Sequence, residues 1–145
     1  MFNPDHFTDA AKRMCALAMN DAVRLKHPCV GTEHLLCAIM GDPQDNPGKH
    51  VLISLRVKPA ELLNQLLMLE IPLSKNKPPL RLAPIAERVF GKVAMEAKGL
   101  GFPYVGTEHF LLAMAKEDCA AIKMLENPGV KREELITRLL SMLGT

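Results

Sequence analysis

Apolar residues recur at intervals of three and four positions along most of the chain, with polar residues between them. Between Asp9 and about Leu25 this spacing predicts an amphipathic helix, whose apolar face comprises Ala11, Cys15, Ala18, Ala22 and Leu25. Pro28 ends this helix, because the residue before a proline is disfavoured in the α region. Thr32 is then predicted to cap a second helix that continues through Ile39.

Two further helices complete the first half of the chain. After a turn-rich loop from Gly41 to Gly48, a short apolar helix is predicted around residues 51–55. Pro59 suits the first turn of a fourth helix, whose apolar face comprises Leu62, Leu63, Leu66, Leu67 and Leu69. We predict that this leucine face, like the one at residues 135–143, belongs to the core rather than to a groove.

The same order of elements returns after a polar, proline-bearing linker at residues 71–81. Pro84 opens a helix that runs to about Lys98, and Thr107 caps the next. A short helix at about residues 120–126 and a last helix from about Lys131 follow. The alternation with a period of two that marks half-buried strands is not found. The predicted fold class is therefore all-α.

An internal repeat accounts for this order. The residues Val30-Gly31-Thr32-Glu33-His34 return unchanged as residues 105–109, an offset of 75 positions from Val30 to Val105. With that offset, residues 7–40 lie over residues 82–115 without a gap, and the flanks share Ala11/Ala86, Arg13/Arg88, Ala22/Ala97, Leu25/Leu100, Pro28/Pro103, Leu36/Leu111 and Ala38/Ala113. Matched flanks indicate two copies of one structural unit.

The repeat predicts the domain organisation. We expect one domain over residues 1–145, built from two tandem four-helix repeats at about residues 7–70 and 82–143, with the linker at 71–81. A unit of about 65 residues is marginal as an independent core. The two repeats are therefore predicted to pack on each other about a pseudo-twofold axis.

Composition and charge exclude several classes of protein. The net charge is +2 and aromatic residues make up 4% of the 145 residues, so neither electrostatics nor base stacking favours a nucleic-acid partner. No apolar run approaches the roughly 18 residues of a membrane span, and residues 1–9 lack the apolar segment of a signal peptide. The four cysteines form no C-x-x-C pair, and we read them as reduced, buried side chains of a cytoplasmic protein.

No pattern for catalysis, a cofactor or a metal is found. The segment Gly48-Lys49-His50 lacks both the earlier glycine and the following Ser or Thr of a nucleotide-binding loop. Glu33 and His34, like Glu108 and His109, are adjacent on a helix and do not share a face, and the H-E-x-x-H zinc pattern is absent. Cys29 near His27 has no flanking signature of a cysteine nucleophile. The chain is therefore predicted not to be an enzyme.

The doubled pattern F-T-x-x-A…L-x-H-x-x-V-G-T-E-H-L-L, which includes Phe7, Thr8, Ala11, Leu25 and His27, resembles the N-terminal domain of Clp ATPases, most closely the ClpC branch. The resemblance covers about residues 2–143. In that family the domain precedes two ATPase modules that unfold proteins for the ClpP protease. The resemblance implies a docking module that binds adaptor proteins, tagged or misfolded substrate proteins and Clp subunits, and in the ClpC branch phosphoarginine.

The same resemblance implies particular binding residues. Glu33 and Glu108 match the glutamates that contact the guanidinium of phosphoarginine, for which a carboxylate offers bidentate geometry. Thr8 matches the threonine that receives the phosphate at a helix N-terminus. In the second repeat this position is Ala83, so we expect the first repeat to bind phosphoarginine through Glu33 and Thr8 and the second to bind weakly. Arg81 is a candidate to supply charge there.

Structural roles compete with these assignments. The two threonines of the repeated motif suit helix caps. His34 and His109 suit packing beneath their own helices with a hydrogen bond to a backbone carbonyl. Two other functions also stay open: an accessory subunit that docks on a Clp complex without touching substrates, and a regulator that sequesters a ligand of the full-length unfoldase. The chain is either a segment of a longer unfoldase or a free-standing protein.

Overall fold

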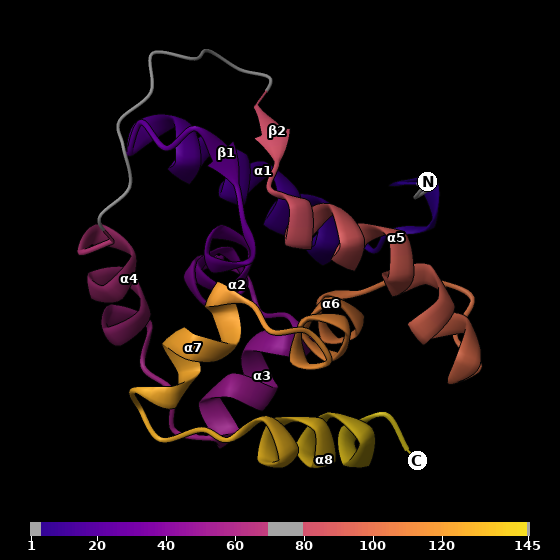
Figure 1. Cartoon of the computed structure of the whole chain (residues 1–145). Helices are drawn as coiled ribbons and strands as arrows, with labels where there is room; N and C mark the ends of the chain where they lie inside the picture. Colours follow the sequence, from indigo (N-terminus) through magenta and orange to yellow (C-terminus); the bar gives the residue numbers. More distant parts are fainter. Residues whose placement is uncertain (1–3, 70–79, 145) are drawn as a thin grey trace.

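The structure, a computed structural model, describes residues 4–69 and 80–144. Most of the expected linker at 71–81 lies outside these residues. Within them the elements are η1 (Pro4–His6), α1 (Asp9–Arg24), β1 (Cys29–Val30), α2 (Thr32–Gly41), α3 (Pro47–Ser54), α4 (Pro59–Leu67), β2 (Arg81–Leu82), α5 (Pro84–Gly99), α6 (Thr107–Ala115), α7 (Ala120–Glu126) and α8 (Arg132–Met142). The predicted all-α fold class is confirmed, with α1–α4 forming a first half and α5–α8 a second half (Figure 1).

Helix α1 forms where the apolar spacing predicts it. The Thr8 hydroxyl caps its N-terminus by accepting a hydrogen bond from the Ala11 backbone N–H at 3.1 Å. Lys26 has a φ of 59°, a left-handed conformation that ends the helix. The buried face contains Met14 along with three alanines, whereas Cys15, predicted to be part of the buried face, is only half-buried.

Helices α2 and α6 form the centre of the core. Every residue of α6 is buried, as are eight of the ten residues of α2. Helix α1 packs on α2 and α5 packs on α6, so each half places its longest helix over its most buried one (Figure 1). A helix that is apolar on all sides is stable only when other elements cover it completely. This arrangement fixes the N-termini of α2 and α6, which carry the repeated motif.

The predicted caps of α2 and α6 are wrong. The N-cap residues are Gly31 and Gly106, so both threonines occupy the first helical position. Their hydroxyls reach the other half of the molecule instead. Thr32 Oγ1 accepts from the Ala121 backbone N–H at 3.2 Å, at the start of α7, and Thr107 Oγ1 accepts from the Gly48 N–H at 2.9 Å, at the start of α3.

Two very short parallel pairings also cross between the halves. Strand β1 pairs with β2, which immediately precedes α5 (Figure 1). The equivalent contact is an isolated bridge between Phe7, just before α1, and Val105. Each long helix therefore begins against the loop of the opposite half. Strands of two residues are too short for an alternating pattern to reveal them in the sequence.

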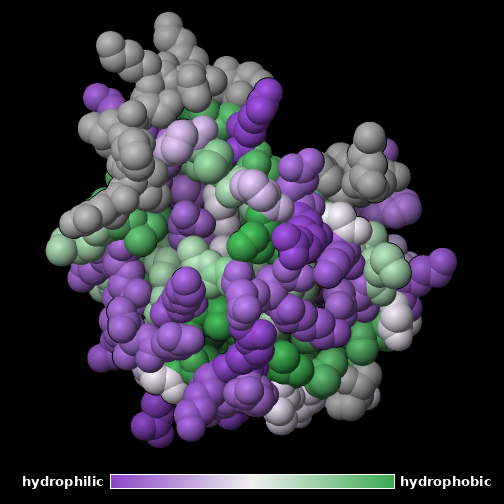
Figure 2. Space-filling model, viewed as in Figure 1, coloured by the Kyte–Doolittle hydropathy of each residue, from purple (hydrophilic) through white to green (hydrophobic). Residues whose placement is uncertain are grey.

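The leucine face of α4 is only partly in the core. Leu62 and Leu66 are fully buried, but Leu63 is 42% and Leu67 55% exposed, which contradicts the prediction that the whole face is core. In α8, Leu135 and Leu139 are buried. Charged and polar residues cover much of the face seen in Figure 2, with apolar residues between them. In the part of the chain that the structure describes, no helix is long and apolar enough to cross a membrane.

Candidate functional site

The repeated motif builds two similar helix N-termini. Glu33 and Glu108 each lie in the first turn of their helix, where the positive end of the helix dipole favours a carboxylate. Both carboxylates fold back over the glycine two residues earlier, so that a Cβ on Gly31 or Gly106 would collide with a carboxylate oxygen. The glycine is thus the residue that permits this position of the acid.

The two glutamates differ in their surroundings. Glu33 is half-buried, whereas Glu108 is only 5% exposed. Among the described residues, Glu108 Oε1 has no hydrogen-bond partner and lies 4.0 Å from the Nδ1 atom of His109. Burial raises the pKa of Glu108, and a hydrogen bond from its own backbone N–H opposes that rise only in part. Glu33 is therefore the more accessible carboxylate for a cationic ligand.

The two histidines of the motif act as helix caps. His34 Nδ1 accepts from the Gly31 backbone N–H and His109 Nδ1 from the Gly106 N–H, each at 2.9 Å. The expected hydrogen bond to a backbone carbonyl is therefore wrong, because each ring accepts from a backbone N–H instead of donating to a carbonyl oxygen. Neutral rings in this arrangement carry their proton on Nε2. Burial lowers the pKa of both rings to about 4, assisted at His34 by the charge of His27 and opposed at His109 by Glu96.

The remaining ring nitrogens show how the halves have diverged. His34 Nε2 lies 2.7 Å from His27 Nδ1, and the tautomer set by the cap makes His34 the donor. In the second half the position of His27 is occupied by Phe102, whose ring meets His109 edge-on at a centroid distance of 4.9 Å. His109 Nε2 consequently has no hydrogen-bond partner among the described residues. Within residues 80–144, two buried side-chain polar atoms thus have no hydrogen-bond partner among the described residues, one on His109 and one on Glu108.

The expected grouping of Thr8 with Glu33 stays a prediction, and the backbone contact of Thr8 is to the loop of the other copy of the motif. The Thr8 backbone N–H donates to the Val105 carbonyl at 2.9 Å, which places Thr8 beside the loop that leads to Glu108. The Ala83 N–H donates to the Val30 carbonyl at 2.8 Å, beside the loop that leads to Glu33. Thr8 and Ala83 lie beside different copies of the motif because each long helix starts against the loop of the opposite half. The structure thus groups Thr8 with the Glu108 loop and Ala83 with the Glu33 loop.

A cavity of about 580 Å³ lies at the start of α5, next to the Glu33 loop. Its lining includes Pro28, Cys29, Arg81, Ala83 and Glu87. Arg81 is exposed and brings a positive charge to the helix start that lacks the hydroxyl of Thr8. Arg81 thus lines this cavity at the start of α5, and its role in supplying charge there stays a prediction.

A second cavity, of about 330 Å³, has no counterpart among the sequence-based expectations. It lies between α1, β2 and α5, and its lining includes Phe7, Lys12, Cys15, Met19, Leu35 and Phe90. We call it the α1–α5 pocket. The sequence feature that could have indicated this pocket is the set of positions at which the two repeats differ, such as Cys15 and Phe90.

The cysteines and other ligating side chains form no reactive cluster in the described segments. All four thiols are free, and no group of three or more His, Cys, Asp or Glu side chains there is arranged to hold a metal ion. Cys37 and Cys119 are buried as predicted, whereas Cys15 and Cys29 are half-buried. Burial raises the pKa of Cys15 to about 11 and that of Cys37 to about 12, so both thiols are weak nucleophiles at neutral pH.

Comparison with known proteins confirms the resemblance inferred from the motif. Residues 6–128 match the family described as the Clp repeat (R) N-terminal domain. The ATP-dependent Clp protease ATP-binding subunit ClpC of Staphylococcus epidermidis is 33% identical over 139 residues, which cover 95% of this chain and 17% of that protein. The Hsp104 N-terminal domain of Candida albicans has a TM-score of 0.78 at 22% identity, covering 95% of this chain and 91% of that one. A ClpV N-domain solved in complex with a VipB peptide has a TM-score of 0.70 at 16% identity, covering 96% and 88%.

Proposed function

Because the chain belongs to the Clp N-terminal domain family, we propose that it is a protein-recognition module of a Clp unfoldase or protease system, which binds adaptor proteins and tagged or misfolded substrates. The chain spans 17% of the length of the ClpC relative, which is named as the ATP-binding subunit of a protease. The peptide complex of the ClpV N-domain supports a role in which this fold binds a polypeptide segment. Its partners are proteins, and catalysis belongs to the proteins with which it works.

The finer proposal is that the module binds phosphoarginine. The observation that supports it is the loop before Glu33, where Pro28 and Cys29 line a cavity together with Arg81 and the start of α5. The Glu33 carboxylate, which follows this loop, is half-buried. A carboxylate receives a guanidinium in bidentate geometry, and a helix start with a nearby cation suits a phosphate. Because Ala83 lacks a hydroxyl, Arg81 takes the role that Thr8 has at the other helix start.

The Glu108 loop is the weaker of the two sites in this proposal. It has the Thr8 hydroxyl nearby, but that hydroxyl already accepts a hydrogen bond from the α1 backbone. The Glu108 carboxylate is buried, and a guanidinium that reaches it must displace the side chains around it. We therefore expect one strong site per chain, at Glu33.

Titration calorimetry with free phosphoarginine tests the finer proposal. The expected result is about one site per chain, weakened at least tenfold by Glu33→Gln and less than threefold by Glu108→Gln, with arginine and inorganic phosphate as control ligands. Loss of one partner of a charge pair in a binding site typically costs about 2–5 kcal/mol, enough to abolish micromolar binding. Two equal sites, or equal sensitivity to both substitutions, would contradict the proposal.

A pull-down with the 145-residue chain tests the coarser proposal separately. A recognition module enriches adaptors and tagged or damaged proteins. An accessory subunit, the alternative function, enriches Clp ATPase and protease subunits alone. Glu33→Gln serves as the matched variant, because it removes the acid without changing the size of the side chain.

A further inference from the structure

A cavity of about 270 Å³ lies where α1, α2 and the start of α4 meet. Its lining includes Leu17 and Asp21 from α1, Gly41 from α2, and Pro59 and Leu63 from α4. We call it the Gly41 cavity. Its volume is below the range of about 300–1,000 Å³ that is usual for small-molecule sites, and it suits a single long side chain.

The second half of the molecule has a lysine at the equivalent place. At the offset of 75 residues, Asp21 corresponds to Glu96 and Gly41 to Lys116. Lys116 Nζ donates to both carboxylate oxygens of Glu96, at 3.0 and 2.8 Å, and so joins the end of α6 to α5. The second half therefore shows which group this arrangement of an acid and a neighbouring helix end binds.

The first half keeps the acid and lacks the lysine. Gly41 is exposed at the end of α2, and a Cβ at this position would point into open space. The Asp21 carboxylate is close to α2, because its charge adds to the effect of burial in raising the pKa of Cys37. The Gly41 cavity thus has a negative charge on one side and an open place where Lys116 stands in the other half.

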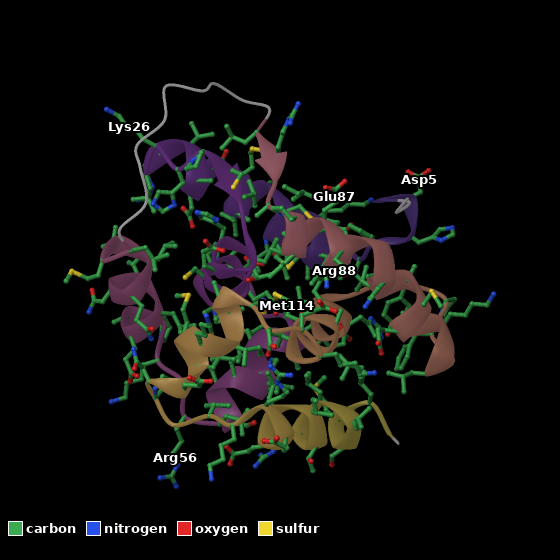
Figure 3. The ribbon with its side chains drawn as sticks, viewed as in Figure 1. Asp5, Lys26, Arg56, Glu87, Arg88 and Met114 are labelled. Carbon is green, nitrogen blue, oxygen red and sulfur yellow. The ribbon has the colours of Figure 1, made fainter. Side chains whose placement is uncertain are left out.

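Arg24 does not take the place of that lysine. It donates to Asp21 Oδ1 at 2.9 Å from one turn further along the same helix, and its side chain is exposed. An exposed pair of this kind is weak. In the part of the chain that the structure describes, Asp21 Oδ2 makes no hydrogen bond, and Lys26, the next cation along the chain, extends outward from the end of α1 (Figure 3). Asp21 can therefore accept a second cation from the side of α2.

We propose that the Gly41 cavity receives a lysine side chain of a partner protein, whose ammonium pairs with Asp21 as Lys116 pairs with Glu96. The methylene groups of that lysine lie against Leu17 and Pro59. Leu63 and Leu67 are exposed one helical turn apart on α4, so the residues that flank the lysine are apolar. The expected partner segment is an amphipathic helix with one lysine in its apolar face. The inference rests on the proposed role in protein recognition and adds a second contact surface to it.

Fluorescence anisotropy tests the proposal on the 145-residue chain. The probe is a labelled amphipathic helical peptide, blocked at both ends, that carries one lysine within a leucine face. Replacement of this lysine by norleucine should weaken binding at least fivefold. Asp21→Asn should weaken the lysine peptide to a similar extent and leave the norleucine peptide within twofold. Asp9→Asn, at an exposed aspartate of the same helix, is the matched control and should leave both peptides within twofold.

Two further measurements locate the bound peptide. Gly41→Lys copies the second half, so its own lysine should pair with Asp21 and abolish the preference for the lysine peptide, whereas Gly41→Ala should keep that preference. In amide chemical shifts measured by NMR, the lysine peptide should cause its largest changes around Leu17, Gly41 and Leu63.

Equal binding of the lysine and norleucine peptides, or binding of neither, would overturn the proposal. So would equal effects of Asp21→Asn and Asp9→Asn, or shift changes confined to the α1–α5 pocket or the Glu33 loop. If the pull-down still enriches substrates or adaptors in any of these cases, the recognition function stands and only the lysine-specific surface fails.

Discussion

The hydroxyl of Thr107 accepts a hydrogen bond from the backbone N–H of Gly48, 59 residues earlier in the chain, at 2.9 Å. The same hydroxyl donates to Asn46 Oδ1 at 2.9 Å, in a buried network that also satisfies the start of α3. Thr32 makes the equivalent contact to Ala121, and there the N-cap residue is Cys119 in place of Asn46. Helix starts in each half are therefore completed by a threonine from the other half.

Replacement of these threonines by valine keeps their shape and removes the hydroxyl. Thr107→Val should lower the free energy of unfolding by about 1–3 kcal/mol, because the Gly48 N–H is left buried without an acceptor. Thr32→Val should cost less, since it breaks one contact and Thr107→Val breaks two. Urea denaturation followed by circular dichroism measures both; a larger loss for Thr32→Val would contradict this view of the network.

The His27–His34 contact offers a second prediction. His27→Phe copies the second half and leaves His34 Nε2 without its acceptor, so we expect a loss of about 1–3 kcal/mol in the free energy of unfolding. His50→Phe, at an exposed position, is the control and should change stability by less than about 0.5 kcal/mol. Comparable effects of the two substitutions would mean that the His27–His34 contact does not stabilise the fold.

Stability should fall in mildly acidic solution because of the two capping histidines. Their pKa values are lowered to about 4 in the folded state, against 6.5 for an unperturbed ring, so the unfolded chain binds more protons between these limits. The histidine contribution is complete above pH 6.5 and is lost as the pH falls towards 4. A shift of this size corresponds to roughly 3 kcal/mol for each ring at most. Melting temperatures measured from pH 7.5 to 4 should show the decline.

Glu108 acts in the opposite direction. Its raised pKa means that the folded state holds a proton more tightly than the unfolded state does, so protonation in acid relieves the cost of burying its charge. Glu108→Gln should therefore raise the melting temperature at pH 7.5 and make the decline in acid steeper than in the unmodified chain. An unchanged pH profile would show that Glu108 is not a source of the pH dependence.

Two ion pairs occupy equivalent positions in the two repeats, but only one of the two carboxylates has a second cationic partner. Arg13 contacts the buried Asp42 at 2.9 Å, and Arg88 contacts Glu117 at 3.3 Å, but Glu117 also pairs with Lys92. Arg13→Ala leaves a buried carboxylate without a cation and should cost about 3–5 kcal/mol. Arg88→Ala should cost about 1 kcal/mol or less, because the second cation remains. Thermal unfolding of the two variants side by side checks the order, and equal losses would count against it.

The helices were predictable because helix spacing and breakers are local features of the chain. Pro59 and Pro84 open α4 and α5 as expected, and α7 coincides with the predicted residues. The prediction that threonines cap α2 and α6 failed for a physical reason. The side-chain atom that accepts from the N-cap glycine belongs to the histidine three residues after that glycine, and the threonine hydroxyl bonds to the other half of the molecule. Local patterns do not record a partner 59 or 89 residues away.

The positions of the two repeated motifs were predictable from the sequence, whereas the elements that lie beside each motif were not. The duplicated Gly-Thr-Glu-His segment correctly identifies two equivalent helix starts. Which first helix lies beside which loop depends on the packing of the halves, and there the exchange places Thr8 against Val105. The exposure of Leu63 also depends on packing. Helical periodicity identifies an apolar face but not how much of that face the neighbouring elements cover.

The reciprocal pairing of Phe7 with Val105 and of Leu82 with Val30 makes the molecule equivalent to a swapped homodimer whose two protomers have been fused into one chain. Neither half contains all the backbone partners for its own first helix. A polypeptide that carried one half alone would present an unpaired strand and an uncapped helix to solution, and its nearest complement would be a second copy of itself. Fusion into one chain allows the two copies to diverge in sequence, so Cys15 and Leu35 can occupy positions where the second half carries Phe90 and Phe110.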